Sequence, residues 1–168
     1  FRYIRSSSRS HEIAVELLKF EKKPEEVHRR LFANHTSQKV AYLAHALQKI
    51  EFFSKDRVAF LHIKKSDLTT HQLDLDESRD VIDLIMNIET LEAAALIRED
   101  GPNNFKLSLR SKGEFEVLAL AESIGGGGHA FSSGAYLTGP IETLKAKVIE
   151  GLLQQVKKND HLKTSESA

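Results

Sequence analysis

The chain has 168 residues, enough to bury one core with some appended helices, and its 24 basic and 24 acidic side chains give a formal net charge of zero. This balance excludes a global basic field, so any contact with nucleic acid has to be local, and the absence of cysteine excludes disulfides, zinc-thiolate sites and thiol nucleophiles. The lack of cysteine fits a reducing cytoplasm, where the protein is expected, and no apolar run approaches the ~20 residues that cross a bilayer, so no membrane partner is expected.

Amphipathic helices are expected in the first third of the chain. The first covers about Ser10 to Phe20 and ends before Pro24, which suits the first turn of the second helix because it lacks an N–H group. Ser37 is expected to cap the third helix. The apolar residues of this third helix recur at helical spacing: Val40, Leu43, Ala44, Leu47 and Ile50. These helices need a surface to pack against.

From Asp56 onward the pattern changes to strands separated by helices. Compact apolar strands are expected at residues 58–63 and 92–98, with a helix between them that Ser78 caps. One face of that helix is apolar: Val81, Leu84, Ile85 and Ile88.

The next strand, Phe105 to Arg110, alternates apolar and polar residues as a half-buried strand does. A turn at residues 101–104, Gly-Pro-Asn-Asn, favours a hairpin with the strand before it. A last helix begins near Pro140, and residues 161–168 are expected to form a disordered tail. The predicted fold class is therefore α/β, a mixed β-sheet flanked by helices and preceded by linker helices.

Four consecutive glycines, Gly125 to Gly128, precede His129 and join a helix that ends near Ile124 to a strand at 134–139. Glycine lacks a Cβ atom and tolerates positive φ, so the N–H groups of such a run can converge on an anion, and the imidazole adds a hydrogen bond or a charge. The alternative is a flexible hinge. Because both flanking segments are expected to pack, the pattern favours a phosphate-binding loop.

A cationic turn follows the alternating strand and supplies Arg110, Ser111 and Lys112 together. A guanidinium can bind a phosphate through two parallel hydrogen bonds, whereas an ammonium acts as a point charge. A basic turn alone is usually only a solvated surface. This motif indicates a phosphate site only in combination with the glycine run.

The two motifs together resemble a known family. The stretch SLRSKGEFEVLALAESIGGGGHAFSSG, which ends at Gly134, is similar to the signature of the DHH-associated C-terminal domain of DHH phosphoesterases, especially the nanoRNase type that also acts on 3′-phosphoadenosine 5′-phosphate. The opening FRYIRSSSRSHEIAVELL resembles the segment that closes the catalytic DHH domain. The resemblance implies that residues 1–54 hold the end of that domain and linker helices, that 55–160 form the substrate-binding domain, and that 161–168 are the tail.

The resemblance also implies a function. The chain would be the C-terminal substrate-binding part of a metal-dependent phosphoesterase that hydrolyses short oligoribonucleotides and 3′-phosphoadenosine 5′-phosphate. In this family manganese is held by the N-terminal DHH domain, and no Asp-His-His occurs here. The chain is thus expected to supply no catalytic residue and no metal ligand, and to be inactive alone. The implied partners are single-stranded RNA or a nucleotide and the DHH domain, and a homodimer stays open.

The residues that the resemblance assigns to substrate binding come from the two motifs: Arg110, Ser111, Lys112, Gly126, Gly127, Gly128, His129 and Ser133. The family usually has alanine at the position of Ser132, so its hydroxyl is either an added phosphate donor or a replacement for a small packed residue, and packing is favoured. Tyr136 can stack on a base, but an aromatic residue in a strand more often belongs to a core.

Other functions stay open from the sequence. A cyclic or linear dinucleotide phosphodiesterase of the same superfamily is one alternative, and an inorganic polyphosphate hydrolase is a more distant one. A stand-alone, non-catalytic nucleic-acid-binding module is the alternative from another class. An upstream segment with several aspartates and Asp-His-His would favour an enzyme over such a module.

Overall fold

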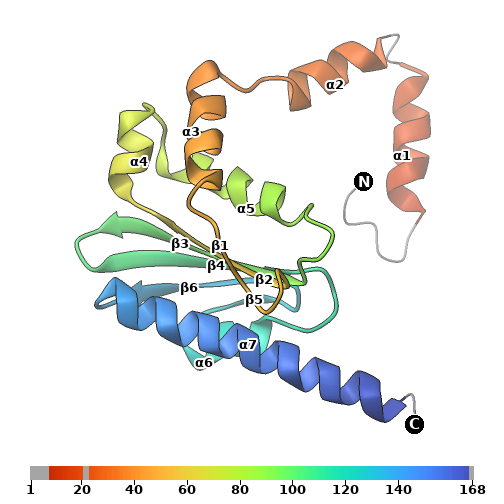
Figure 1. Ribbon diagram of the computed structural model, residues 1–168. Coiled ribbons are helices and arrows are strands. Elements are labelled where there is room, and N and C mark those ends of the chain that lie inside the picture. The colour runs from red at the N-terminus through yellow and green to blue at the C-terminus, as the bar shows by residue number, and fades with distance from the viewer. Residues whose placement is uncertain (1–7, 21–22, 167–168) are drawn as a thin grey trace. The chain divides into compact units, whose positions relative to one another are not determined.

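The computed structural model describes residues 8–20 and 23–166, which fall into two compact units, Phe1–Thr36 and Ser37–Ala168. The first unit contains α1 (Arg9–Leu18) and α2 (Pro24–Phe32), close to their expected positions (Figure 1). No residue of these two helices is buried. Most of the opening FRYIRSSSRS, residues 1–7, lies outside the described part of the chain.

The second unit is built on a six-stranded sheet in the order β1-β2-β3-β4-β6-β5 (Figure 1). Its strands are β1 (Glu51–Phe53), β2 (Val58–Ile63), β3 (Ala93–Gly101), β4 (Asn104–Ser111), β5 (Gly127–His129) and β6 (Ser132–Thr138). Strands β2 and β3 pair in parallel, and the other neighbours pair antiparallel, including the expected β3–β4 hairpin. The mixed sheet confirms the predicted α/β class.

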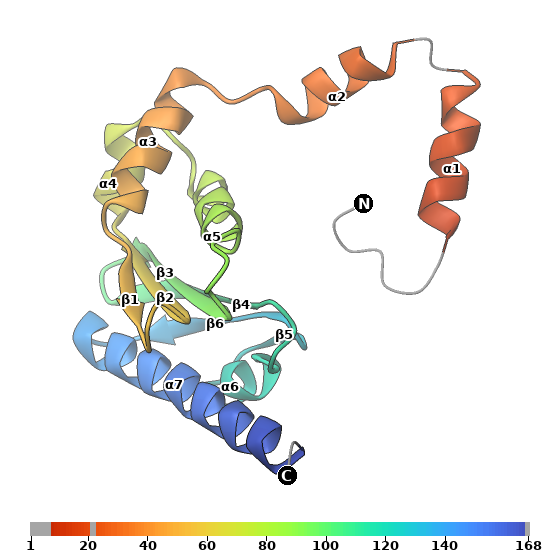
Figure 2. The ribbon, with the colours of Figure 1, turned by 45° about the vertical axis from the view of Figure 1, so that its right-hand side comes forward.

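Helices cover both faces of this sheet (Figure 2). Short elements lie on one face: α3 (Ser37–Leu47), α4 (Lys65–Thr70), the 3₁₀ helix η1 (Leu75–Arg79) and α5 (Asp80–Ile85). The other face carries α6 (Leu118–Ser123) and the long α7 (Ile141–Glu166). None of the described helices is long and apolar enough to cross a membrane.

The burial of the strands explains their sequence patterns. Strand β2 and the first part of β3, residues 93–97, lie between the two helical layers, so both of their faces are buried and their sequences are nearly continuous apolar runs. Strand β4 alternates because only one of its faces is covered: Phe105, Leu107 and Leu109 pack in the core beneath α7. The opposite face of β4 carries Lys106 and other polar residues. The α3–α5 layer packs its core on β2 and β3 only.

The helical faces differ in part from those expected. In α3, Tyr42 and Ala46 are fully buried, whereas Val40 is 56% exposed. Ser78 does not cap a long helix but lies buried in η1, where its hydroxyl donates to the Leu75 carbonyl at 2.7 Å. The helix α5 (Asp80–Ile85) is shorter than predicted, and it buries Val81, Ile82 and Ile85 while Leu84 is exposed.

The prediction of a disordered tail at 161–168 is wrong up to Glu166, because α7 stays helical to that residue. Arg57 donates two hydrogen bonds to the Asp160 carboxylate, at 2.6 and 2.8 Å, and two to the Glu92 carboxylate, at 3.0 and 3.1 Å. The hydrogen bonds from Arg57 hold the pKa of Asp160 below its ordinary value. Lys163 forms an ion pair with Glu114 one turn later. These charged contacts attach the last turns of α7 to the segments before β2 and after β4, a tertiary effect that local composition does not reveal.

Asp67 links α3 to α4 and is buried in the first turn of α4. It accepts a hydrogen bond from the Lys64 backbone N–H at 3.0 Å and one from Lys49 Nζ at 2.7 Å, and His45 Nε2 lies 3.2 Å away. Burial opposes ionisation of this carboxyl, but the donors, led by Lys49, outweigh burial and lower its pKa below 3.8.

This lowered pKa predicts how stability depends on pH. The contribution of Asp67 should be complete above its unfolded-state pKa and be lost as the pH falls through its lower folded-state pKa. Asp67→Asn should therefore reduce the free energy of unfolding by about 1–3 kcal/mol at neutral pH, and the difference should narrow in acid. Urea denaturation across a pH series measures both quantities.

Asp76→Asn is the matched control, because this exposed carboxylate pairs with the surface residue Arg79. The substitution should reduce the free energy of unfolding by less than ~1 kcal/mol. If the loss of unfolding free energy in Asp67→Asn stayed constant from neutral to acid pH, the ion pairing of the Asp67 carboxylate would be contradicted.

Candidate functional site

Three strands present aligned side chains on the face that α3–α5 leave open. Residues directly opposite in antiparallel strands share a face of the sheet. The register aligns Arg110 on β4 with Ser132 on β6, and Ser132 in turn with His129 on β5. Two further rows follow along β4 and β6: Ser108 with Gly134, and Lys106 with Tyr136.

This face holds a pocket of about 460 Å³, which we call the open-face pocket. Its lining combines basic, hydroxyl, glycine and aromatic residues: Arg79, Lys106, Arg110, Ser108, Ser132, Gly125 to Gly128 and Tyr136. The pocket brings Arg110 and the glycine run together, as the sequence motifs suggested. A cationic pocket floored by small residues can accommodate a phosphorylated ligand close to the backbone.

Arg110 is held at the pocket by an acidic partner. Its Nε lies 3.6 Å from Asp83 Oδ1 on α5, and its Nη1 donates to the Leu109 carbonyl at 3.1 Å. Arg79, which enters the same pocket from η1, pairs with Asp76 at 3.0 Å. A phosphate that reaches Arg110 therefore competes with Asp83. Arg79 was not predicted to lie at this site, because only the packing of η1 beside the sheet brings it near β4.

The glycine run is not the loop that the sequence predicted, since Gly127 to His129 form the edge strand β5. The N–H groups of Gly125 and Gly126 donate to the carbonyls of Glu122 and Ala121 at the end of α6, at 3.0 and 2.8 Å. These two N–H groups thus cap the C-terminal end of α6. Successive glycine N–H groups were expected to contact an anion instead.

Two of the glycines are required by packing. A Cβ atom on Gly126 would lie 2.6 Å from that of Ala135, and one on Gly128, where φ is +141°, would lie 2.7 Å from Ser133 Cα. Gly127 differs, because a Cβ there would meet nothing within 4 Å. Its missing side chain instead leaves room in the pocket that it lines.

Ser111, Lys112 and Ser133 make contacts to the backbone. The Ser111 hydroxyl donates to the Phe115 carbonyl at 2.8 Å, and Lys112 Nζ donates to the carbonyls of residues 88 and 89. Ser133 is buried, and its hydroxyl donates to the His129 carbonyl at 2.6 Å. Ser133 lines the pocket, whereas Ser111 and Lys112 lie outside its lining.

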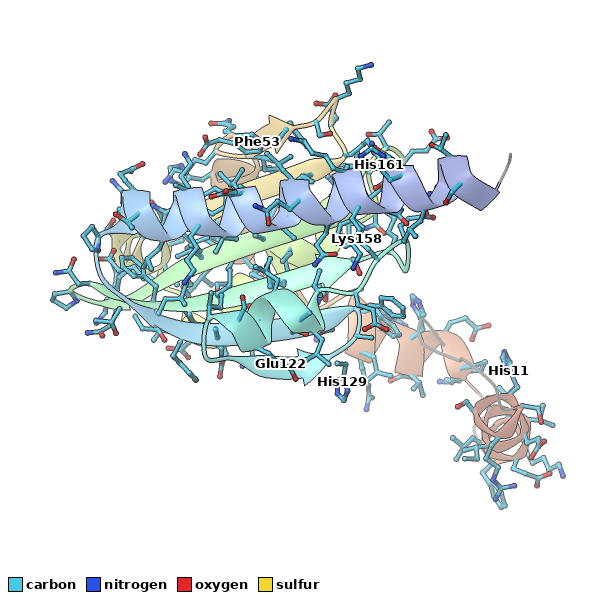
Figure 3. All side chains as sticks on the ribbon, turned by 90° about the horizontal axis from the view of Figure 1, so that it is seen from below. His11, Phe53, Glu122, His129, Lys158 and His161 are labelled. Carbon is cyan, nitrogen blue, oxygen red and sulfur yellow. The ribbon has the colours of Figure 1, made fainter. Side chains whose placement is uncertain are left out.

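His129 and Tyr136 are both exposed. Figure 3 shows His129 beside α6 at the edge of the sheet, in the row of Arg110 but outside the pocket lining. Tyr136 is 75% exposed, which corrects its expected place in a core, and Lys106 Nζ lies 5.7 Å from its ring centroid. Ser132 also faces the pocket rather than a packed interior.

Potential metal ligands do not cluster in the described part of the chain. Among residues 8–20 and 23–166, no group of three or more His, Cys, Asp or Glu side chains is placed to hold a metal ion. The basic and small residues of the pocket suit an anion, and the described residues form no donor set for a hard divalent cation.

Residues 56–159, more than half of the chain, match the model of the DHHA1 domain. The chain belongs to the DHHA1 domain family. This DHH-associated match confirms the coarser part of the resemblance, and the open-face pocket lies wholly within the matched DHHA1 residues.

Two solved structures share the fold. An exopolyphosphatase-related protein from Bacteroides fragilis is 23% identical with a TM-score of 0.79, over 94% of this chain and 46% of that one. A pGpG-specific phosphodiesterase from Vibrio cholerae is 14% identical with a TM-score of 0.52, over 93% of this chain and 53% of that one. The DHHA1 chain thus spans about half the length of each of these proteins.

The two roles of glycine in this run predict different losses of stability when adjacent glycines are replaced. Gly126→Ala should destabilise the protein by about 1–3 kcal/mol, because its Cβ collides with β6. Gly127→Ala should change the unfolding free energy by less than ~0.5 kcal/mol, because its Cβ has space. Chemical denaturation of the two variants compares them directly. Equal losses at both positions would contradict the assignment of close packing to Gly126.

Proposed function

We propose that this chain is the C-terminal substrate-binding part of a DHH-family phosphoesterase that hydrolyses short oligoribonucleotides and 3′-phosphoadenosine 5′-phosphate in the cytoplasm. The observation that carries the proposal is the open-face pocket, where Arg110 and the glycine run meet on a cationic surface. Membership of the DHHA1 family supports the phosphoesterase context.

In this proposal the residues of the two motifs divide into two groups. Arg110 binds a substrate phosphate through its guanidinium fork, His129 approaches from the end of the same row, and Gly126 to Gly128 let the phosphate approach the backbone. Ser111, Lys112 and Ser133 act through their hydrogen bonds to carbonyls, which hold the strand ends that present these groups. Arg79 adds a second guanidinium to the same pocket.

The proposal assigns the metal, manganese or another divalent cation, to a DHH domain that pairs with this chain. The described residues do not provide its ligands. The contribution of the chain to catalysis is then to hold the scissile phosphate in place, and correct orientation can remove ~7–11 kcal/mol of the barrier.

A linear dinucleotide phosphodiesterase is the second candidate. The fold that the chain shares with the pGpG-specific phosphodiesterase motivates it, and both candidates require the same phosphate contacts. Turnover of pGpG, of longer oligoribonucleotides, of 3′-phosphoadenosine 5′-phosphate and of cyclic di-adenylate by a protein that includes the DHH domain separates the candidates. If pGpG or the cyclic dinucleotide is hydrolysed much faster than the other substrates, the oligoribonuclease assignment is wrong.

The division of labour between the two domains makes a direct prediction. The chain alone should bind 5′-phosphorylated diadenylate weakly and should not hydrolyse it when manganese is added, because binding residues are present without a metal site. Calorimetric titration measures the binding, and chromatography of the nucleotide after prolonged incubation measures the cleavage. Metal-dependent turnover by the purified chain would contradict this division.

The phosphate contacts predict the effects of substitution. Arg110→Ala and His129→Ala should each weaken diadenylate binding about 10- to 150-fold, the range of a lost charged hydrogen bond, and leave the unfolding midpoint nearly unchanged. Arg110→Lys should recover only part of the loss, because a point charge does not reproduce the fork. Binding isotherms and thermal melts of the same samples provide both readouts.

Lys158→Ala and His161→Ala are the matched controls, because both residues are exposed on α7 (Figure 3). They should leave affinity unchanged. Wild-type affinity in Arg110→Ala and His129→Ala would remove these residues from the site, and a large drop in melting temperature would assign them to structure.

A further inference from the structure

Tyr136 is a large aromatic residue on the interior of a strand, yet its side chain lies in solvent. It is 75% exposed, whereas Leu137 beside it on β6 is buried in the core beneath α7. The side chains before it on the same face are small, Gly134 and Ser132. The ring of Tyr136 therefore projects from a face whose neighbouring residues on β6 are small. Packing within the second unit does not account for a ring at this position.

The ring has a cationic neighbour in its own row. Lys106 is directly opposite on β4, and its Nζ lies 5.7 Å from the ring centroid, within the range of a cation–π contact. This contact restricts the ring while most of its surface stays accessible. An accessible, oriented aromatic face is the feature with which proteins bind an unpaired base by stacking.

The row of Tyr136 lies at one end of the open-face pocket, and the row of Arg110 lies at the other. Tyr136 and Ser132 are four residues apart on β6, so at the strand rise the two rows are roughly 13 Å apart. The row between them is floored by Ser108 and Gly134. The two ends of the pocket therefore differ: one carries the Arg110 guanidinium, and the other carries an aromatic ring with an ammonium.

We infer that Tyr136, supported by Lys106, forms a nucleobase subsite of the open-face pocket, so that the pocket selects phosphorylated nucleosides over inorganic polyphosphate. The inference rests on the proposed function, since it extends the ligand whose phosphate Arg110 binds. A base has a π face that can stack on the ring, and a polyphosphate chain has none. A chain of phosphates would gain only the charge of Lys106 at that end.

The test compares two anions on the same protein. Calorimetric titration of the 168-residue chain with 5′-phosphorylated diadenylate and with inorganic tripolyphosphate is repeated for Tyr136→Ala, Tyr136→Phe and Phe52→Ala. Tyr136→Ala should weaken diadenylate binding about 5- to 150-fold and leave tripolyphosphate binding unchanged. Tyr136→Phe keeps the stacking face and should stay within about twofold of the unchanged chain. Phe52→Ala removes an exposed aromatic residue from β1 and should have no effect.

The variant Arg110→Ala separates the nucleobase subsite from the proposed function, because it should weaken the binding of both anions. Failure of both anions to bind the unchanged chain overturns the proposed function and the subsite together. Diadenylate binding that survives Tyr136→Ala within twofold overturns the subsite alone, as does an equal loss for both anions.

A second measurement does not depend on a variant that folds. In the unchanged chain, stacking of adenine should shift the ring-proton resonances of Tyr136 upfield, and saturating tripolyphosphate should not. Resonances of Tyr136 that do not move when diadenylate saturates the protein would overturn the subsite.

Discussion

The alternation of apolar and polar residues along β4 is the constraint on which the rest of the site depends. Its apolar side chains are committed to the core beneath α7, which forces the intervening residues Lys106, Ser108 and Arg110 onto the opposite face. On β2 and β3 that opposite face is covered by the α3–α5 layer, and on β4 and β6 it is not. The pocket exists because the helical layer is narrower than the sheet.

The glycine run satisfies two demands that act on neighbouring residues. It must bring β5 against β6 closely enough that side chains at Gly126 and Gly128 would collide, and it must leave Gly127 bare at the pocket. Four glycines in a row therefore do not mean four backbone donors aimed at a ligand, because the first two close α6. Packing and ligand access together account for the run better than either does alone.

The sequence predicted the elements whose signal is local. The continuous apolar runs of β2 and β3, the alternation of β4 and the turn between β3 and β4 follow directly from how each strand is buried. The strand β5, by contrast, consists of two glycines and a histidine, residues with weak strand propensity, and forms only because β6 offers a partner. The last turns of α7 likewise depend on Arg57, more than a hundred residues earlier in the chain.

The sequence motifs predicted some residues of the candidate site but not all of them. Arg110 and the glycines stand out by composition, and the register of β4, β6 and β5 brings them together. Arg79 enters through the packing of η1, and Tyr136 and Lys106 become neighbours only through strand pairing. Lys112 belonged to the same motif as Arg110, yet its ammonium turns to the carbonyls that follow α5. Such choices depend on tertiary contacts that spacing alone does not contain.

If the open face of β4, β6 and β5 binds a phosphorylated nucleoside, amide NMR of the chain during titration with 5′-phosphorylated diadenylate should reveal it, because each backbone N–H reports its own surroundings. We expect saturable shifts concentrated at residues 106–110, 126–129 and 132–136, with α7 and the α3–α5 core little affected. Shifts concentrated on α7, or no saturable shifts at any concentration, would contradict it.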